Sequence, residues 1–129
     1  MRELWINLIV KSIAEAKKFY QAIGFELNPR FEQATEVASL LFGNQAVVVM
    51  LFEESFFTDK LPHGLTADSK QKEVLISISA SSVEDADQLV EKAIAAGGKR
   101  LGSSGWSGNM YNTGFIDIDG HWWNRSDER

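Results

Sequence analysis

The chain of 129 residues contains no cysteine, two prolines and only two histidines, His63 and His121. Without cysteine it has no disulfide, no thiol nucleophile and no cysteine-type zinc site, so a metal centre would have to rely mainly on carboxylates. The absence of cysteine also fits a protein of a reducing compartment, and we expect a cytoplasmic location.

Positive charge and long apolar runs are scarce as well. The 13 basic residues are outnumbered by 18 acidic ones, which gives a net charge of −5, and the basic residues form no cluster. This excludes the electrostatic footprint of a nucleic-acid-binding protein. No apolar run reaches the roughly 18 residues of a transmembrane helix, and the first residues lack the apolar core of a signal peptide. We therefore expect neither a nucleic-acid nor a membrane partner.

Apolar and aromatic residues are plentiful. Hydrophobic residues make up 44% of the chain, with eight Phe, four Trp and two Tyr. That content is enough for a packed core, and the length favours a single domain, since domains typically hold about 100–200 residues.

The first half of the chain reads as strand, helix and three further strands. Residues 4–10 alternate in polarity as a strand covered on one side. Ser12 is a predicted helix N-cap, and Gly24 is the residue expected just past the helix end. Further strands are predicted over 25–28, 35–42 and 45–53, with a tight turn at 43–44.

The second half repeats this order after an irregular stretch at 54–72, which is long enough to predict a functional loop. A strand over 74–80 leads to a helix capped by Ser81 or Ser82, and Ser81 and Glu84 have capping-box spacing. Later segments are predicted as a short strand at 99–101, a Gly/Ser loop at 102–108, a strand at 110–117, a hairpin turn at 119–120 and a last strand at 121–125.

The two halves match position by position when 70 is added to the residue number. Trp5 corresponds to Leu75, Ser12 to Ser82, and the apolar stripes of the two helices have the same spacing. We therefore predict an α+β fold of two tandem βαβββ modules that form an open, mixed-sheet barrel around a cleft. The expected single domain consists of module 1 at about 1–56, a linker at about 57–72 and module 2 at about 73–129.

Two segments carry a family resemblance. The run from Asn7 to Phe25 includes Phe19-Tyr20-Gln21-Ala22-Ile23-Gly24-Phe25, and the segment 114–123 contains Asp117-Ile118-Asp119-Gly120-His121-Trp122-Trp123. Both resemble the vicinal oxygen chelate superfamily, which includes glyoxalases, extradiol dioxygenases and the fosfomycin and bleomycin resistance proteins. The resemblance implies the glyoxalase-like fold, usually a dimer, with a divalent metal in the cleft.

The positions at which the family carries its metal ligands fall here on Trp5, Met50, Leu75 and Asn124. The first three offer no hard oxygen or imidazole donor, and the amide of Asn124 is a weak, neutral one. We therefore predict a degenerate metal site, with no metal and no cofactor.

Strand alternation also predicts which side chains line the cleft, and the set is apolar and aromatic with a few weak hydrogen-bonding groups. We expect ligand-binding residues at Trp5, Asn7, Met50, Phe52, Leu75, Ser77, Trp122 and Asn124, with Ile9, Val48 and Ser79 beside them and Trp106 as a lid. The aromatic members could equally pack in a core or a dimer interface. No general base is evident.

These observations favour a homodimeric binding protein for a small, partly aromatic molecule. One alternative is a metal-dependent glyoxalase-like lyase or extradiol dioxygenase, and another is a dimer without a small ligand. Two further predictions concern the last hairpin of the chain. Asp117 to Gly120 reads as a hairpin turn rather than a calcium loop, and the strand after Trp123 turns polar and is predicted to end early.

Overall fold

The computed structural model describes residues 4–43, 47–57, 61 and 72–128. The chain divides into two compact units, Met1–Ala67 and Asp68–Arg129.

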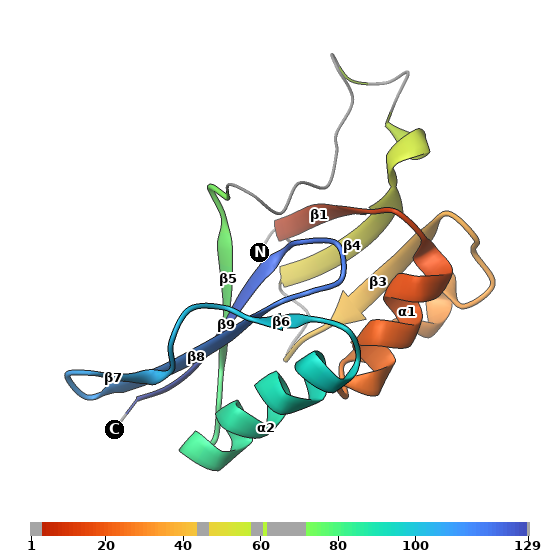
Figure 1. Cartoon of the computed structure of the whole chain (residues 1–129). Helices are drawn as coiled ribbons and strands as arrows, with labels where there is room; N and C mark the ends of the chain where they lie inside the picture. Colours follow the sequence, from red (N-terminus) through yellow and green to blue (C-terminus); the bar gives the residue numbers. More distant parts are fainter. Residues whose placement is uncertain (1–3, 44–46, 58–60, 62–71, 129) are drawn as a thin grey trace. The chain divides into compact units, whose positions relative to one another are not determined.

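Unit 1 is a four-stranded mixed sheet with one long helix (Figure 1). The sheet order is β1-β4-β3-β2, with β1 parallel to β4 and the other pairs antiparallel. Its elements are β1 (Leu4–Val10), α1 (Ile13–Ala22), β2 (Glu26–Leu27), the 3-10 turn η1 (Pro29–Phe31), β3 (Val37–Leu41), β4 (Val47–Glu53) and the 3-10 turn η2 (Glu54–Phe56).

Helix α1 begins and ends where the sequence predicts. The Ser12 hydroxyl accepts a hydrogen bond from the Glu15 amide at 3.2 Å, and the Glu53 carboxylate accepts one from the Ile13 amide at 2.9 Å. Both bonds satisfy amides that have no partner within the helix. Gly24 follows the helix with a φ of 91°, a left-handed conformation that glycine adopts without strain.

Unit 2 repeats the connectivity of unit 1. Its sheet order is β5-β9-β8-β6, β5 is parallel to β9, and the short β7 pairs with β8. The predicted α+β class and the tandem βαβββ repeat are therefore confirmed. The elements are β5 (Leu75–Ser79), α2 (Val83–Ala95), β6 (Lys99–Arg100), β7 (Gly105–Ser107), β8 (Met110–Ile116) and β9 (Trp122–Glu128).

The start of α2 differs from the predicted capping box. Ser82 is the N-cap, and its hydroxyl accepts from the Asp85 amide at 3.0 Å. The reciprocal bond runs from the Ser81 amide to the Asp85 carboxylate, also at 3.0 Å. The acidic partner is thus Asp85 rather than Glu84, because the helix begins one residue later than the Ser81 spacing implied.

Two strand predictions in unit 2 were incomplete. Residues 105–107 within the predicted Gly/Ser loop form β7, because residues 108–109 turn the chain back so that it pairs with the start of β8. Strand β9 continues to Glu128 although its sequence is polar, because it pairs with β8 along its whole length. An inner strand can carry polar side chains when its backbone ladder is complete.

Both units bury an apolar core between helix and sheet. In unit 1, Ala16 and Tyr20 of α1 and Leu51 of β4 are buried, and in unit 2, Trp123 of β9 and Val90 of α2 are fully buried. In the stretch predicted as a functional loop, the described Phe56 and Phe57 pack on Phe52 with ring centroids 4.7 and 5.1 Å away. The turn predicted at 43–44 lies partly outside the described residues. Within the described part of the chain, neither helix is long and apolar enough to cross a membrane.

Candidate functional site

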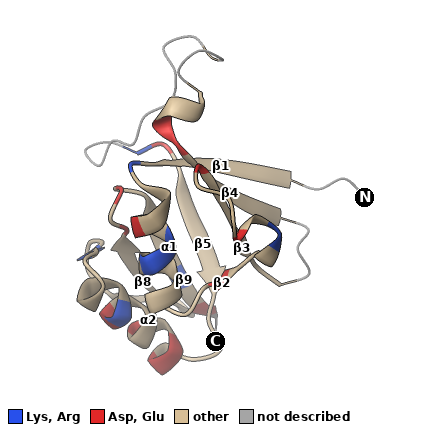
Figure 2. Ribbon diagram, turned by 90° about the vertical axis from the view of Figure 1, so that its right-hand side faces the viewer, with Lys and Arg blue, Asp and Glu red and all other residues tan. Residues whose placement is uncertain are grey.

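The sheet of unit 2 has one face toward α2 and one face that no helix of this unit covers. In the strand register, Ser77 lies opposite Asn124, which lies opposite Gly114. Two residues further along β9, Ser126 pairs with Ser79 of β5 on one side and with Asn112 of β8 on the other. Because residues in register share a face, these side chains all project away from α2. Figure 2 shows that β5 carries no charged residue.

Four of these side chains form one hydrogen-bonded group, which we call the amide–hydroxyl cluster: Ser77, Asn112, Asn124 and Ser126. The two N–H groups of Asn124 Nδ2 are shared among three acceptors, Ser126 Oγ at 2.7 Å, Asn112 Oδ1 at 3.3 Å and Ser77 Oγ at 3.4 Å. Ser126 Oγ donates to Asn112 Oδ1 at 2.7 Å. Every member of the cluster is uncharged.

The cluster lies in an open depression of about 930 Å³. Apolar side chains of Leu75, Ala80 and Met110 border it, and Asp127 is the one acidic residue along its lining. Asp127 is only 7% exposed, and its position in β9 directs its side chain toward the α2 face. The depression therefore offers a neutral polar centre within an apolar rim, which is typical of small-molecule sites.

Contacts on the opposite face hold β8 and β9 against α2. Tyr111, next to Asn112, donates from its hydroxyl to Asp87 Oδ1 at 2.6 Å. Arg125, between Asn124 and Ser126, donates from its guanidinium to Asp85 Oδ2 at 2.7 Å. Because these anchors alternate with cluster residues along each strand, they fix the strands that present the cluster.

Both anchors shift a pKa. The hydrogen bond to Asp87 raises the pKa of Tyr111 above its usual value of 10.0, and partial burial adds to this rise. The bond from the Ser81 amide lowers the pKa of Asp85 below its usual value of 3.8. Burial opposes this effect, and the charge of Arg125 adds to it.

The turn between β8 and β9 is built on one buried carboxylate. Asp117 Oδ1 accepts from the amides of Asp119 at 2.9 Å and His121 at 2.8 Å. Its other oxygen lies 2.8 Å from His121 Nδ1 and accepts from Trp123 Nε1 at 3.3 Å. The interpretation of this segment as a hairpin turn is confirmed, and the buried, multiply bonded carboxylate gives Asp117 and His121 a structural role.

The predicted ligand-binding residues fall on both units. In unit 1, Trp5 is 51% exposed, Asn7 is exposed on the same face of β1, and Met50 is only 2% exposed. Phe52 lies in the cluster of three phenylalanines. In unit 2, Leu75, Ser77 and Asn124 line the depression, and Trp122 lies beside Leu75 in register.

Trp106 occupies a different place from the rest of the predicted set. It lies opposite Tyr111 in register, with ring centroids 5.4 Å apart, and Tyr111 points toward α2. Trp106 is 54% exposed on that side of the sheet, away from the amide–hydroxyl cluster. Its assignment as a lid stays a prediction.

Six residues that line the depression were absent from the predicted set: Ile78, Ala80, Met110, Asn112, Ser126 and Asp127. Asn112 and Met110 alternate with the buried Tyr111 and Thr113, which is a signal for one shared face. Ser126 was overlooked because the last strand was predicted to end at Arg125.

A divalent metal of the kind implied by the family fold does not fit the residues at the predicted ligand positions. Trp5, Met50 and Leu75 have no oxygen or imidazole donor, and Asn124 offers only one neutral amide oxygen. Among the described residues, no group of three or more His, Asp or Glu side chains could hold a metal ion. Mg²⁺, Mn²⁺ and Zn²⁺ need several oxygen or nitrogen donors with compensating charge.

The chain thus consists of two tandem βαβββ units, each with a helix on one face of its sheet. This arrangement defines a protein of the glyoxalase-like fold. The Glyoxalase/Bleomycin resistance protein/Dioxygenase superfamily matches residues 4–124, and the chain belongs to this superfamily. A search of curated proteins found no match.

Solved structures with the same fold cover nearly the whole chain. The chain is similar to the hypothetical protein SA1046 from S. aureus, with 29% identity and a TM-score of 0.83 over 98% of this chain and 94% of that one. It also resembles a glyoxalase/bleomycin resistance protein/dioxygenase family enzyme from Burkholderia phytofirmans PsJN, with 15% identity and a TM-score of 0.79 over 100% of both chains. The fosfomycin resistance protein FosX from Mesorhizobium loti shares 12% identity, with a TM-score of 0.67 over 100% of this chain and 92% of that one.

Proposed function

We propose that this protein binds a small, neutral, partly aromatic molecule at the amide–hydroxyl cluster, without a family-type metal and without a cofactor. The single observation that carries the proposal is the depression on unit 2, where four linked uncharged side chains lie inside an apolar rim. The same fold in a metal-dependent lyase or dioxygenase would need ligands that the matching positions lack.

The hydrogen bonds within the cluster leave specific atoms for a ligand. Among the described residues, Asn124 Nδ2 is fully engaged, whereas Asn124 Oδ1 and Asn112 Nδ2 have no hydrogen-bond partner. The site thus offers one acceptor group and one donor group on the neighbouring strands β9 and β8, and no charge. A ligand with a neutral carbonyl and an N–H or O–H group matches this pattern, whereas an ion would lose its hydration without gaining a counter-charge.

Three probes with the same ring test this preference. Benzamide is neutral with a donor and an acceptor, benzoate is an anion, and benzylamine is a cation. We expect benzamide to bind most tightly, detected as a change in the fluorescence of Trp122, which lies on the same face. Replacing both Asn112 and Asn124 with Ala should weaken benzamide binding by about tenfold or more, since each lost bond costs roughly 1 kcal/mol.

Asn109→Ala is the matched control, because Asn109 is exposed in the β7–β8 turn and does not border the depression. Tighter binding of benzoate than of benzamide would contradict the proposal. So would a stoichiometric, tightly held transition metal in the purified protein, which would favour the lyase or dioxygenase alternative.

We also propose that the protein is a homodimer. Strands β1 and β5 lie at the edges of their sheets. Exposed apolar side chains lie on or beside them: Leu4 is 59% exposed and Val74 59%. Such edges are commonly covered by another surface. Sedimentation equilibrium should give twice the chain mass, and Leu4→Lys should shift the equilibrium toward the monomer. A monomer at all concentrations would contradict this.

A further inference from the structure

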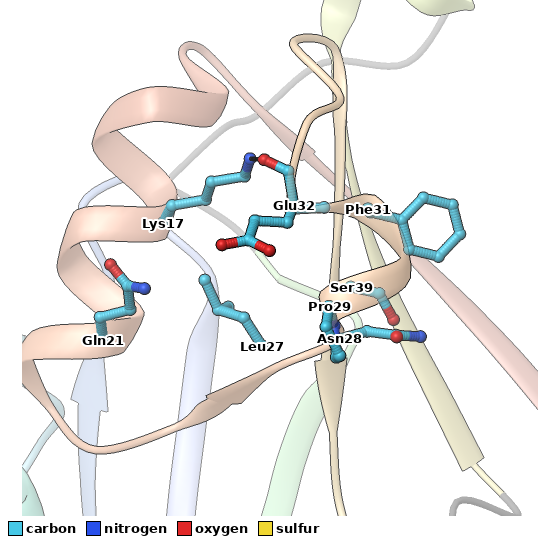
Figure 3. A pocket seen from close by; sticks show the side chains of 9 residues that line it. Lys17, Gln21, Leu27, Asn28, Pro29, Phe31, Glu32 and Ser39 are labelled. Carbon is cyan, nitrogen blue, oxygen red and sulfur yellow. Dashed lines mark hydrogen bonds between the residues drawn. The ribbon is translucent and has the colours of Figure 1, made fainter.

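A second cavity lies in unit 1, on the side of its sheet that faces α1. It measures about 350 Å³, at the small end of ligand sites, and lies between α1 and the segment from β2 to η1 (Figure 3). Leu27, Pro29 and Ala38 provide apolar walls, whereas Lys17, Gln21 and Glu32 provide polar ones. No residue predicted as a ligand contact lines this cavity.

Lys17 is fixed in place by two backbone carbonyls. Its ammonium donates to the carbonyl oxygens of Glu32 and Ala34, both at 3.2 Å. An ammonium group has three N–H donors, so one remains for a further acceptor. The two bonds restrict the long side chain in advance, which reduces the entropy that a ligand contact at this nitrogen would cost.

The exposed side chain of Glu32 brings a negative charge to the border of the cavity, and this charge forms no salt bridge with Lys17. Figure 3 shows the Glu32 carboxylate pointing into the hollow between Lys17 and Leu27, with the Gln21 amide on the helix side. Among the described residues, neither Lys17 nor Glu32 takes part in a salt bridge, with each other or with a third group. One ammonium and one carboxylate therefore border the same small space without contact.

We propose that this cavity binds a small zwitterion of the α-amino acid class with an aliphatic side chain. The ligand carboxylate would accept from the free N–H of Lys17, and its ammonium would donate to the Glu32 carboxylate. The side chain would rest on Leu27 and Ala38. An anion alone would meet Glu32 and a cation alone would meet Lys17, so only a molecule with both charges satisfies both groups.

The test uses the full-length protein with L-leucine, followed through backbone amide shifts in ¹H–¹⁵N spectra. Two analogues each lack one charge: 4-methylpentanoate has no ammonium and isopentylamine has no carboxylate. We expect leucine to shift the amides of Gln21, Leu27 and Ala38, and each analogue to bind about tenfold more weakly. The amide of Asn112 in unit 2 should not move, which separates this site from the one in the proposed function.

Glu32→Gln is the decisive variant, because it removes the carboxylate but keeps the backbone carbonyl that Lys17 contacts. We expect it to weaken leucine binding about tenfold, and Lys17→Met to do the same. Glu36→Gln and Lys18→Met are the matched controls, since both residues are exposed and neither lines the cavity. Absence of shifts at millimolar leucine, equal binding of the analogues, or equal losses in the controls would overturn the proposal.

Discussion

At the residue scale, Gly114 lies where there is no room for a side chain, although its backbone conformation is not one that favours glycine. A Cβ at this residue would lie 2.6 Å from the carbonyl oxygen of Trp123 and 3.3 Å from Leu101 Cδ2. The first contact is with backbone, which cannot rotate away. Gly114 also lies opposite Asn124, so any shift of β8 against β9 would disturb the amide–hydroxyl cluster.

We therefore expect Gly114→Ala to lower the free energy of unfolding by about 1–3 kcal/mol, the usual cost of overpacking. Urea denaturation followed by tryptophan fluorescence would measure it. Gly105→Ala is the matched control in the neighbouring strand β7, where a Cβ would meet nothing within 4 Å. Equal changes in the two variants would show that the loss of glycine, and not the contact with Trp123, determines the effect.

At the scale of elements, the start of α2 connects a helix cap with the strand that carries Asn124. Asp85 accepts from Ser81 at the cap and from Arg125 of β9, and its side chain is 35% exposed. The same carboxylate thus stabilises the helix end and the register of helix against strand. The corresponding link in unit 1 is the bond from the Ile13 amide to Glu53, so each repeat uses a carboxylate at its helix start, but from a different element.

Asp85→Asn should lower the free energy of unfolding at pH 7 by about 1 kcal/mol, a value discounted for partial exposure. The pKa of Asp85 is lowered in the folded state, so its stabilising effect is complete above the unfolded value of 3.8. It is lost as the pH falls through the lower folded pKa. The difference between variant and parent should therefore shrink below pH 4.

Denaturation curves at a series of pH values would measure this convergence. Glu84→Gln is the control, because it removes the same charge from the same exposed helical turn without the bonds to Ser81 and Arg125. A variant that stayed equally destabilised below the folded pKa would contradict the role of the ionised carboxylate.

At the scale of the whole molecule, the repeat of two βαβββ units is the feature that the sequence predicted most clearly. Helix stripes, the Ser12 and Ser82 caps and strand alternation are local patterns, and each appeared twice at a spacing of 70. Their physical causes act within a few residues of the chain, so a single sequence was enough to predict two βαβββ units. The turn at Asp117 could be predicted from the sequence for the same reason, because the hydrogen bonds that hold it join residues at most six positions apart.

The candidate sites depended on longer-range pairing. Alternation predicted that Ser77 and Asn124 share a face, but it could not show that Asn112 and Ser126 join them, because lateral register is fixed by the hairpin between β8 and β9. Strand β7 was missed because a Gly/Ser segment has little intrinsic strand propensity and forms a strand here through its pairing with β8.

The sequence by itself thus determined the two repeated units and the faces of their strands. Only the tertiary structure decided which polar atoms bond to one another in unit 2, and that Lys17 and Glu32 border one cavity in unit 1. Periodicity records the direction in which a side chain points, whereas the neighbours it meets are set by how separate segments pack.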